Sequence, residues 1–176
     1  DGTTIQSVVR CAGELLDMAL DGEDNIYLAA ADQGVIVLDA AGTEIEWTKS
    51  AGGYCRRIDA GDDGTVAALN NNGDGAGAVY VYDTNGEEAG QFSGFQKTQD
   101  IAVSSPHHSI LMIGFENKNS GCNPVQVAYL RAVSFTGDEQ WKNYDWPGTH
   151  LDNCDNDGWE NNMADTRGYR VCLGED

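Results

Sequence analysis

The sequence is poor in proline and basic residues, and it lacks any long apolar segment. It has 3 prolines against 22 glycines among 176 residues. No apolar run approaches the roughly 18 residues that a membrane-spanning helix requires. Lysine and arginine total 10 against 29 acidic residues, which gives a formal net charge of −19. A chain of this charge repels nucleic acid and anionic lipid, so we expect neither nucleic-acid binding nor membrane insertion.

Common catalytic motifs are missing as well. The sequence has no HExxH, GxSxG or P-loop motif, and no dinucleotide-binding glycine pattern in a βαβ context. An enzyme is therefore less expected than a non-catalytic protein. The cysteines form no CxxC pair, which argues against clustered zinc and c-type haem sites. Scattered cysteines in a glycine-rich acidic chain are typical of disulfides formed in an oxidising compartment, so we expect a secreted or extracellular protein.

What the sequence does contain is a repeat of about 40 residues. MALDGEDNIYLAA (18–30) aligns with IDAGDDGTVAALN (58–70) and, with one inserted residue, with IAVSSPHHSILMIGF (101–115). GVIVLDAAGTEIEW (34–47) aligns with AVYVYDTNGEEAGQF (78–92) and RAVSFTGDEQW (131–141). Each copy of the first pattern has an apolar strand, a polar turn and a second apolar strand. Each copy of the second pattern has a strand of alternating apolar residues, a glycine turn and a further strand. Together the two patterns predict two hairpins per repeat, that is, four short strands.

Four strands that recur at this period are typical of a β-propeller blade. We predict a single all-β, β-propeller-like domain over 1–176, and a β-sandwich is the alternative architecture. About three four-stranded blades are expected, near 15–49, 57–92 and 100–144. A long connection at 147–166 and a partial fourth blade at 167–176 would follow.

The fourth strand of each unit resembles the quinoprotein-like repeat of the β-propeller superfamily, in which an acidic residue and a glycine precede a tryptophan. Gly137 and Trp141 have the spacing of that repeat. Trp47 lies one residue later, and Phe92 replaces the tryptophan in the second unit. The resemblance implies the fold, and no quinone site is carried over with it.

The predicted units leave a propeller incomplete. Three blades and one strand present an open sheet edge, and such an edge invites pairing with another strand. The strand-like segment TTIQSVV (3–9) is a candidate for that pairing. Either the chain is a fragment of a longer propeller, or it is a subunit whose neighbours complete its sheet by strand addition. The expected partners are thus the rest of a longer chain or copies of this one.

One loop resembles the opening of a calcium site. The stretch DNCDNDGWENNMAD (152–165) follows the order of an EF-hand loop in its first half, but position twelve is an alanine and bears no carboxylate. A polar turn without a metal is the alternative. Calcium is the one cofactor that the sequence suggests. Its oxygen ligands would come from Asn153, Asp155, Asp157, the Trp159 carbonyl and Asn161.

The positions of the cysteines suggest two disulfides. Cys122 and Cys154 both fall in insertions of the third unit, on the same predicted face, so we expect them to pair. Cys11 and Cys55 both precede an innermost strand and form a weaker second pair. Cys172 is then the candidate for the remaining thiol.

Three basic residues accompany the innermost strands. Arg57, Lys97 and Arg170 could ring the mouth of a central channel and hold an anionic ligand. Pairing with local carboxylates is the alternative.

These observations favour an extracellular structural or interaction module, which builds a larger secreted protein or a fibre-like assembly through strand completion. Two other functions stay open at this point. One is a fragment of a propeller enzyme, either quinoprotein-like or carbohydrate-active. The other is a calcium-dependent adhesion module.

Overall fold

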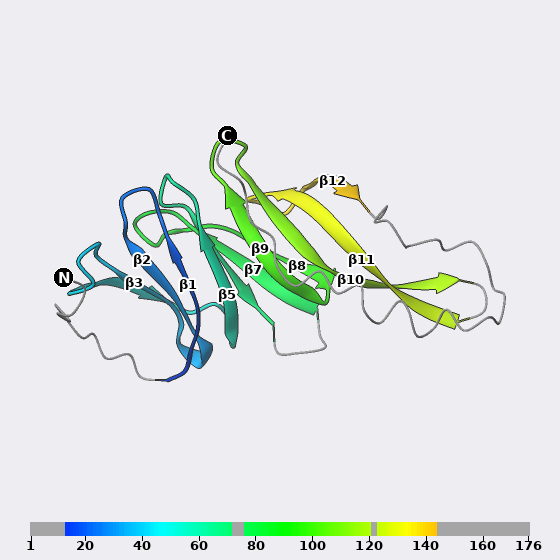
Figure 1. Ribbon diagram of the computed structural model, residues 1–176, viewed down its shortest axis with the longest axis horizontal. Helices are drawn as coiled ribbons and strands as arrows, with labels where there is room; N and C mark the ends of the chain where they lie inside the picture. Colours follow the sequence, from blue (N-terminus) through cyan, green and yellow to red (C-terminus); the bar gives the residue numbers. More distant parts are fainter. Residues whose placement is uncertain (1–12, 72–75, 121–122, 144–176) are drawn as a thin grey trace, which may run out of the picture.

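A computed structural model describes residues 13–71, 76–120 and 123–143. These residues form three antiparallel four-stranded sheets, in which the strands follow one another in chain order (Figure 1). The prediction of an all-β protein with three four-stranded blades is confirmed. We call the sheets blade 1, blade 2 and blade 3 in chain order. The predicted fourth blade lies outside the described residues.

The strands have the following bounds. Blade 1 contains β1 (Leu15–Leu20), β2 (Ile26–Ala30), β3 (Gly34–Leu38) and β4 (Ile45–Lys49), with the 3-10 turn η1 (Ala31–Gln33) between β2 and β3. Blade 2 contains β5 (Cys55–Ala60), β6 (Val66–Asn70), β7 (Ala76–Tyr82) and β8 (Glu88–Gln96). Blade 3 contains β9 (Thr98–Ser104), β10 (Ser109–Ser120), β11 (Asn123–Ser134) and β12 (Glu139–Asn143).

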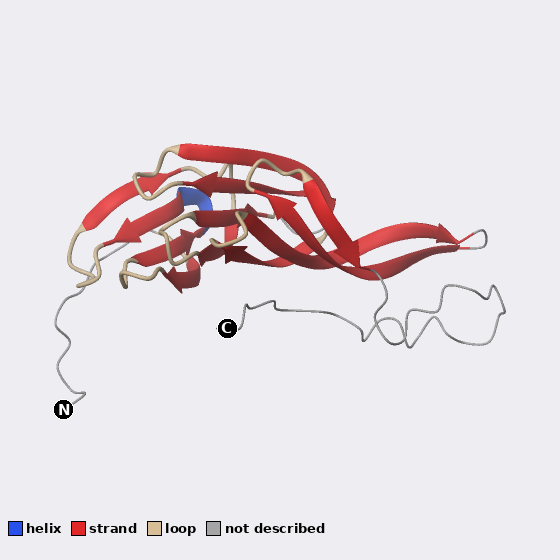
Figure 2. Cartoon of the chain, turned by 90° about the horizontal axis from the view of Figure 1, so that it is seen from above, coloured by secondary structure: helices blue, strands red, loops and turns tan. Residues whose placement is uncertain are grey.

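Blade 3 differs from the other two in its middle hairpin. β10 and β11 pair over 12 residues each, and they extend beyond the rest of the sheet (Figures 1 and 2). Figure 2 also shows that strands dominate the described part of the chain, since η1 is its one short helical segment. No helix among the described residues is both long enough and apolar enough to cross a membrane.

The turn between the third and fourth strands explains the acid-and-glycine signal of the repeat. Asp39 Oδ1 accepts hydrogen bonds from the backbone N–H groups of the residues four and five positions later, at 2.7 and 3.0 Å. Asp83 Oδ1 likewise accepts from the N–H groups two and four positions later, at 2.9 and 2.8 Å. The glycines of these two turns, Gly42 and Gly86, have φ of 64° and 75°, and Gly137 in the equivalent turn of blade 3 has φ of 91°. Glycine adopts this left-handed conformation without the penalty that a side chain brings.

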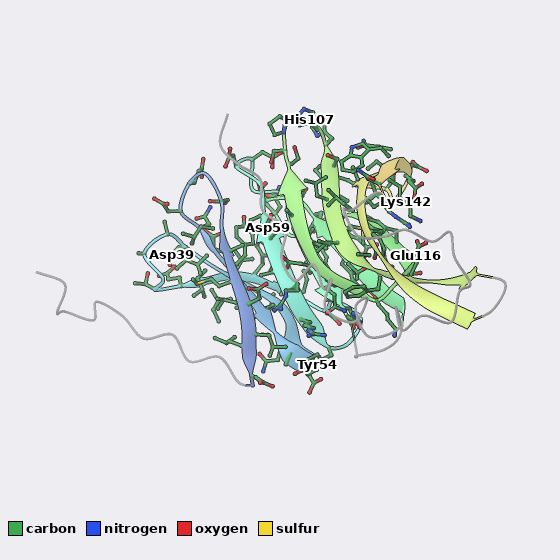
Figure 3. All side chains as sticks on the ribbon, turned by 45° about the vertical axis from the view of Figure 1, so that its right-hand side comes forward. Asp39, Tyr54, Asp59, His107, Glu116 and Lys142 are labelled. Carbon is green, nitrogen blue, oxygen red and sulfur yellow. The ribbon has the colours of Figure 1, made fainter. Side chains whose placement is uncertain are left out.

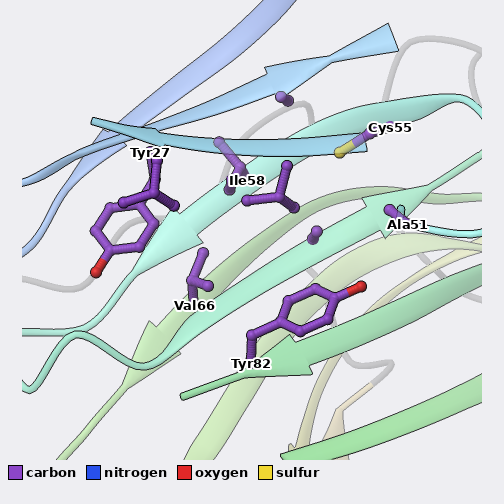
Figure 4. Packing of buried hydrophobic residues seen from close by; sticks show 10 residues of the cluster. Tyr27, Ala51, Cys55, Ile58, Val66 and Tyr82 are labelled. Atoms are coloured by element: carbon purple, nitrogen blue, oxygen red, sulfur yellow. The ribbon is translucent and has the colours of Figure 1, made fainter. Parts of the chain in front are cut away.

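Each blade buries alternate residues on its two faces. We call the face turned toward the next blade in chain order the forward face, and the opposite one the backward face. Tyr27, Ala29 and Val37 on the forward face of blade 1 pack with Ile58 and Val66 on the backward face of blade 2 (Figure 4). A second buried cluster joins the forward face of blade 2 to the backward face of blade 3. Most of the core of the described chain therefore lies between the blades, and a third, smaller cluster lies on the backward face of blade 1.

Candidate functional site

The junctions between blades share a set of polar contacts along the first strand of each blade. Asp17 Oδ2 in blade 1 accepts the backbone N–H of Ile58 in blade 2 at 3.3 Å. Asp59 Oδ2 in blade 2 accepts the N–H of Val103 in blade 3 at 2.7 Å. Each innermost strand is thus tied to the next by an aspartate.

The turns between the first and second strands also touch across the junctions. The Tyr27 hydroxyl in blade 1 lies 3.0 Å from Asp21 Oδ2 and 3.3 Å from the carbonyl oxygen of Gly64 in blade 2. Ser105 Oγ in blade 3 donates to Asp63 Oδ1 in blade 2 at 2.7 Å. These contacts fix the relative position of the sheets as well as their spacing.

An aromatic side chain on the fourth strand completes each junction. The Trp47 indole N–H donates to the Thr84 carbonyl oxygen at 3.2 Å, and a Cβ added to Gly86 would lie 2.8 Å from the Trp47 ring. Phe92 covers Gly137 in the same way, since a Cβ there would lie 2.5 Å from the Phe92 side chain. In both junctions the aromatic residue of one blade covers the turn glycine of the next. The glycine therefore serves the contact as well as the turn.

Positions that are equivalent in the repeat differ in burial according to whether a blade precedes them. The equivalent residues in the first hairpins of the three blades are Met18, Ile58 and Ile101. Met18 lies opposite Leu28, Ile58 lies opposite Ala68, and Ile101 lies opposite Met112. Ile58 is 4% exposed and Ile101 is 3% exposed, because the preceding blade covers each of them. Met18 is 62% exposed. Blade 1 thus presents a backward face of the same design that no described blade covers, and its first strand is exposed there.

The exposed large apolar side chains of the described chain all lie on the two faces that no described blade covers. Four of them lie on the two edge strands of blade 1: Leu15, Met18, Leu20 and Ile45. Their partners across the sheet are, in the same order, Ala30, Leu28, Ile26 and Leu38. These partners and Ile36 form a cluster on the backward face of blade 1. Trp141, which is 45% exposed, lies opposite Ala132 on the forward face of blade 3. These two faces are the candidate functional site.

The acidic residues of the inner strands have an electrostatic consequence. Burial raises the pKa of Asp59 to about 6, and the nearby carboxylates of Asp100 and Asp17 add to the increase, against the lowering effect of its backbone hydrogen bonds. Figure 3 shows Asp59 on the innermost strand of the middle blade. Because the folded chain binds this proton more tightly than the unfolded chain does, its contribution to stability is lost as the pH rises from about 4 through 6.

We therefore expect Asp59→Asn to raise the free energy of unfolding at pH 7.5 by about 2 kcal/mol, with little gain at pH 4. The amide oxygen can still accept the Val103 N–H, while the charge is removed. Urea unfolding at the two pH values measures the difference. Asp63→Asn is the control: burial raises the pKa of Asp63, but hydrogen bonds from Ser105 and Thr65 outweigh it and lower the pKa overall. That variant should lose stability above pH 4, and a loss at pH 7.5 for Asp59→Asn would contradict the expectation.

The structure reaches only part of the site residues predicted from sequence. Arg57 lies within β5, the inner strand of blade 2, and its Nε lies 3.5 Å from Asp100 Oδ1 on the inner strand of blade 3. Lys97 lies between β8 and β9, at φ of 46°. The anion-binding role of these two residues stays a prediction. The remaining predicted ligands lie outside the described residues: Asn153, Asp155, Asp157, Trp159, Asn161 and Arg170.

The described residues contain no disulfide. Cys55 is a free thiol that is fully buried between blades 1 and 2. Burial raises its pKa to about 12, and the Asp17 carboxylate adds to the increase. Its predicted partner Cys11 lies outside the described residues, as do Cys122 and Cys154, so both pairings stay predictions.

An ionic cluster on blade 3 was not anticipated from the sequence. Lys142 Nζ lies 2.6 Å from Glu116 Oε1, and the buried Arg131 guanidinium also binds Glu116 and lies 3.2 Å from Glu139 (Figure 3). The Arg131 guanidinium carbon lies 5.0 Å from the centre of the Tyr129 ring. Only the pairing of β10, β11 and β12 brings these side chains together, so no local motif announces them. No group of three or more metal-binding side chains occurs among the described residues.

Comparison with known proteins decides the fold. No protein-family model matches the chain, and no curated protein sequence matches it. BamB from Moraxella catarrhalis matches with a TM-score of 0.56 and 14% identity, over 77% of this chain and 38% of BamB. Quinohemoprotein alcohol dehydrogenase from Comamonas testosteroni matches with a TM-score of 0.50 and 14% identity, over 75% of this chain and 21% of the enzyme. Both are β-propellers. This chain has a β-propeller-like fold.

The computationally designed Ika4 protein is a further structural neighbour of this propeller-like chain, with a TM-score of 0.58 and 14% identity over 78% of this chain and 76% of Ika4. At this level of identity the three likenesses show the fold alone. The chain spans less than two fifths of BamB and about a fifth of the dehydrogenase. What the propeller does must therefore be argued from its own surfaces.

Proposed function

We propose that the chain is a structural building block of an extracellular assembly, and that the end faces of its blades bind a neighbouring propeller segment. The observation that carries this proposal is the placement of the exposed large apolar residues, from Met18 on blade 1 to Trp141 on blade 3. All of those described lie on the backward face of blade 1 or the forward face of blade 3. Contiguous exposed apolar surface is typical of interaction sites, because covering it is favourable.

The electrostatic character of the chain supports the extracellular part of the proposal. A net charge of −19 and cysteines far apart in sequence suit a secreted protein. The same charge would oppose unspecific association between copies, because acidic surfaces repel one another. Association that occurs despite this repulsion requires a specific apolar contact.

We expect the purified chain to associate reversibly. Sedimentation velocity from about 1 to 100 µM should show a weight-average mass that rises with concentration, as mass action requires. The association should strengthen when salt is raised from ~0.05 to ~0.5 M, because salt screens the repulsion between acidic surfaces but leaves apolar burial in place. A single monomeric species over the whole concentration range, at both salt concentrations, would contradict the proposal.

A further inference from the structure

The two end faces of the described propeller segment are complementary parts of one repeated junction. Within the chain, every junction joins the forward face of one blade to the backward face of the next. The segment presents one face of each kind that no described blade covers. A neighbour that satisfies both faces must itself carry both, and a second copy of this chain does so.

The backward face of blade 1 has the register of the faces that already receive a blade. Met18 corresponds to Ile58 and Ile101, as described above. Two residues closer to the turn, on the same face, Leu20 lies opposite Ile26, just as Val103 lies opposite Ile110 in blade 3. Val103 is 5% exposed and Leu20 is 51% exposed. The difference at each position is the cover that a preceding blade supplies.

The forward face of blade 3 has the register of a face that supplies this cover. Trp47 lies opposite Val37, and Val37 is two residues before Asp39, which begins the turn of blade 1. Trp141 lies opposite Ala132, and Ala132 is two residues before Ser134, which begins the equivalent turn of blade 3. Trp47 packs on blade 2 with its indole N–H bonded to a carbonyl oxygen. Trp141 is the same side chain at the same position, but it is almost half exposed.

We propose that a second copy of this chain binds head to tail, with the forward face of its blade 3 covering the backward face of blade 1. In this contact Trp141 of one copy packs against the apolar strip of the other, which includes Met18 and Ile45. The inference rests on the proposed function and specifies its partner and contact. Such a contact joins two different surfaces, so it propagates until it closes a ring or extends a filament.

Two variants, each blocked at one face, test this contact. Trp141→Glu places a charge on the forward face of blade 3 and leaves blade 1 intact. Met18→Glu blocks the backward face of blade 1 and leaves blade 3 intact. Each should weaken self-association by roughly 30-fold or more, as expected for the loss of a central apolar anchor. Gln91→Glu adds the same charge at an exposed position on the outer strand of blade 2, away from both faces, and should associate like the wild type.

Mixing the two variants in equal amounts makes the test specific for head-to-tail binding. The intact forward face of the Met18→Glu chain can dock on the intact backward face of the Trp141→Glu chain. No further chain can then add, so sedimentation and native mass spectrometry should show a 1:1 pair and nothing larger. Circular dichroism of each variant, at a concentration where the wild type is monomeric, confirms that both variants are folded.

The possible results separate the contact from the function. If the wild type associates and both variants associate equally well, this contact is wrong while the proposed function stands. If one variant is monomeric while the other still self-associates, a face pairs with its own kind and the head-to-tail arrangement is wrong. The arrangement is also wrong if both variants are monomeric and their mixture forms no pair. A wild type that never associates removes the proposed function itself.

Discussion

Replacing Gly34 with valine is expected to lower the free energy of unfolding by at least about 4 kcal/mol, a large part of the stability of an ordinary domain. Gly34 begins β3 in a buried position, with φ of 87° and ψ of −128°. That backbone conformation is strained for any residue with a side chain. An added Cβ would also lie 2.3 Å from the carbonyl oxygen of Lys49, and backbone atoms cannot move away as a flexible side chain can. Chemical denaturation followed by circular dichroism measures the loss.

Gly13→Val separates the two causes of this effect. Gly13 also has a positive φ, 104°, but the nearest atom to an added Cβ is 3.8 Å away in the side chain of Gln33. This variant should lose about 1 kcal/mol, from backbone strain alone. Equal losses for the two valine variants would show that the close approach of β3 to the strand end at Lys49 is not what holds Gly34 in place.

The second large effect is expected for Trp47→Ala, which should cost about 3–4 kcal/mol. The Trp47 ring lies edge-on to Tyr27, with ring centres 6.3 Å apart, and is tilted against Tyr82 at 6.0 Å. Its indole N–H is bonded to Thr84, and its ring covers Gly86. Truncation therefore leaves a cavity at the junction of blades 1 and 2, and it also leaves a carbonyl oxygen without its donor. Urea unfolding with circular dichroism detection gives the cost.

Trp141→Ala provides the matched comparison. It removes the same side chain from the same register, but from a face that no described blade covers. At a concentration where the chain is monomeric, it should change the free energy of unfolding by less than about 1 kcal/mol. If the two alanine variants lost similar amounts in the monomer, Trp141 would already be packed within its own chain, and it could not serve as an anchor for a second copy.

The repeat made most of the described fold predictable. Alternating apolar residues on both sides of acid-and-glycine turns predicted the hairpins, and the period grouped them in fours. The turns form as expected because the Asp39 and Asp83 carboxylates satisfy backbone N–H groups and the glycines accept positive φ. These are local interactions, so they can be recognised in a sequence.

The candidate site was harder to predict because it depends on which residues a neighbouring blade covers. Met18, Ile58 and Ile101 are similar in type, and only the three-dimensional order of the blades separates the exposed one from the buried two. Asp59 did leave a sequence signal, since the aligned positions in the other copies are Ala19 and Ala102. An acid among alanines on an innermost strand could have been flagged, although its raised pKa follows from burial that the sequence does not state.

The junctions have a consequence for how stability is distributed along the array. One buried cluster joins blades 1 and 2, and the other joins blades 2 and 3. To a first approximation, the free energy of the array is then a sum of single-blade terms and nearest-neighbour terms, as in a one-dimensional Ising chain. Blade 2 has two such coupling terms and each end blade has one, so local opening should begin at the ends. Every copy added head to tail would turn two end blades into interior ones, and polymerisation would thereby suppress the fraying of the subunits that it joins.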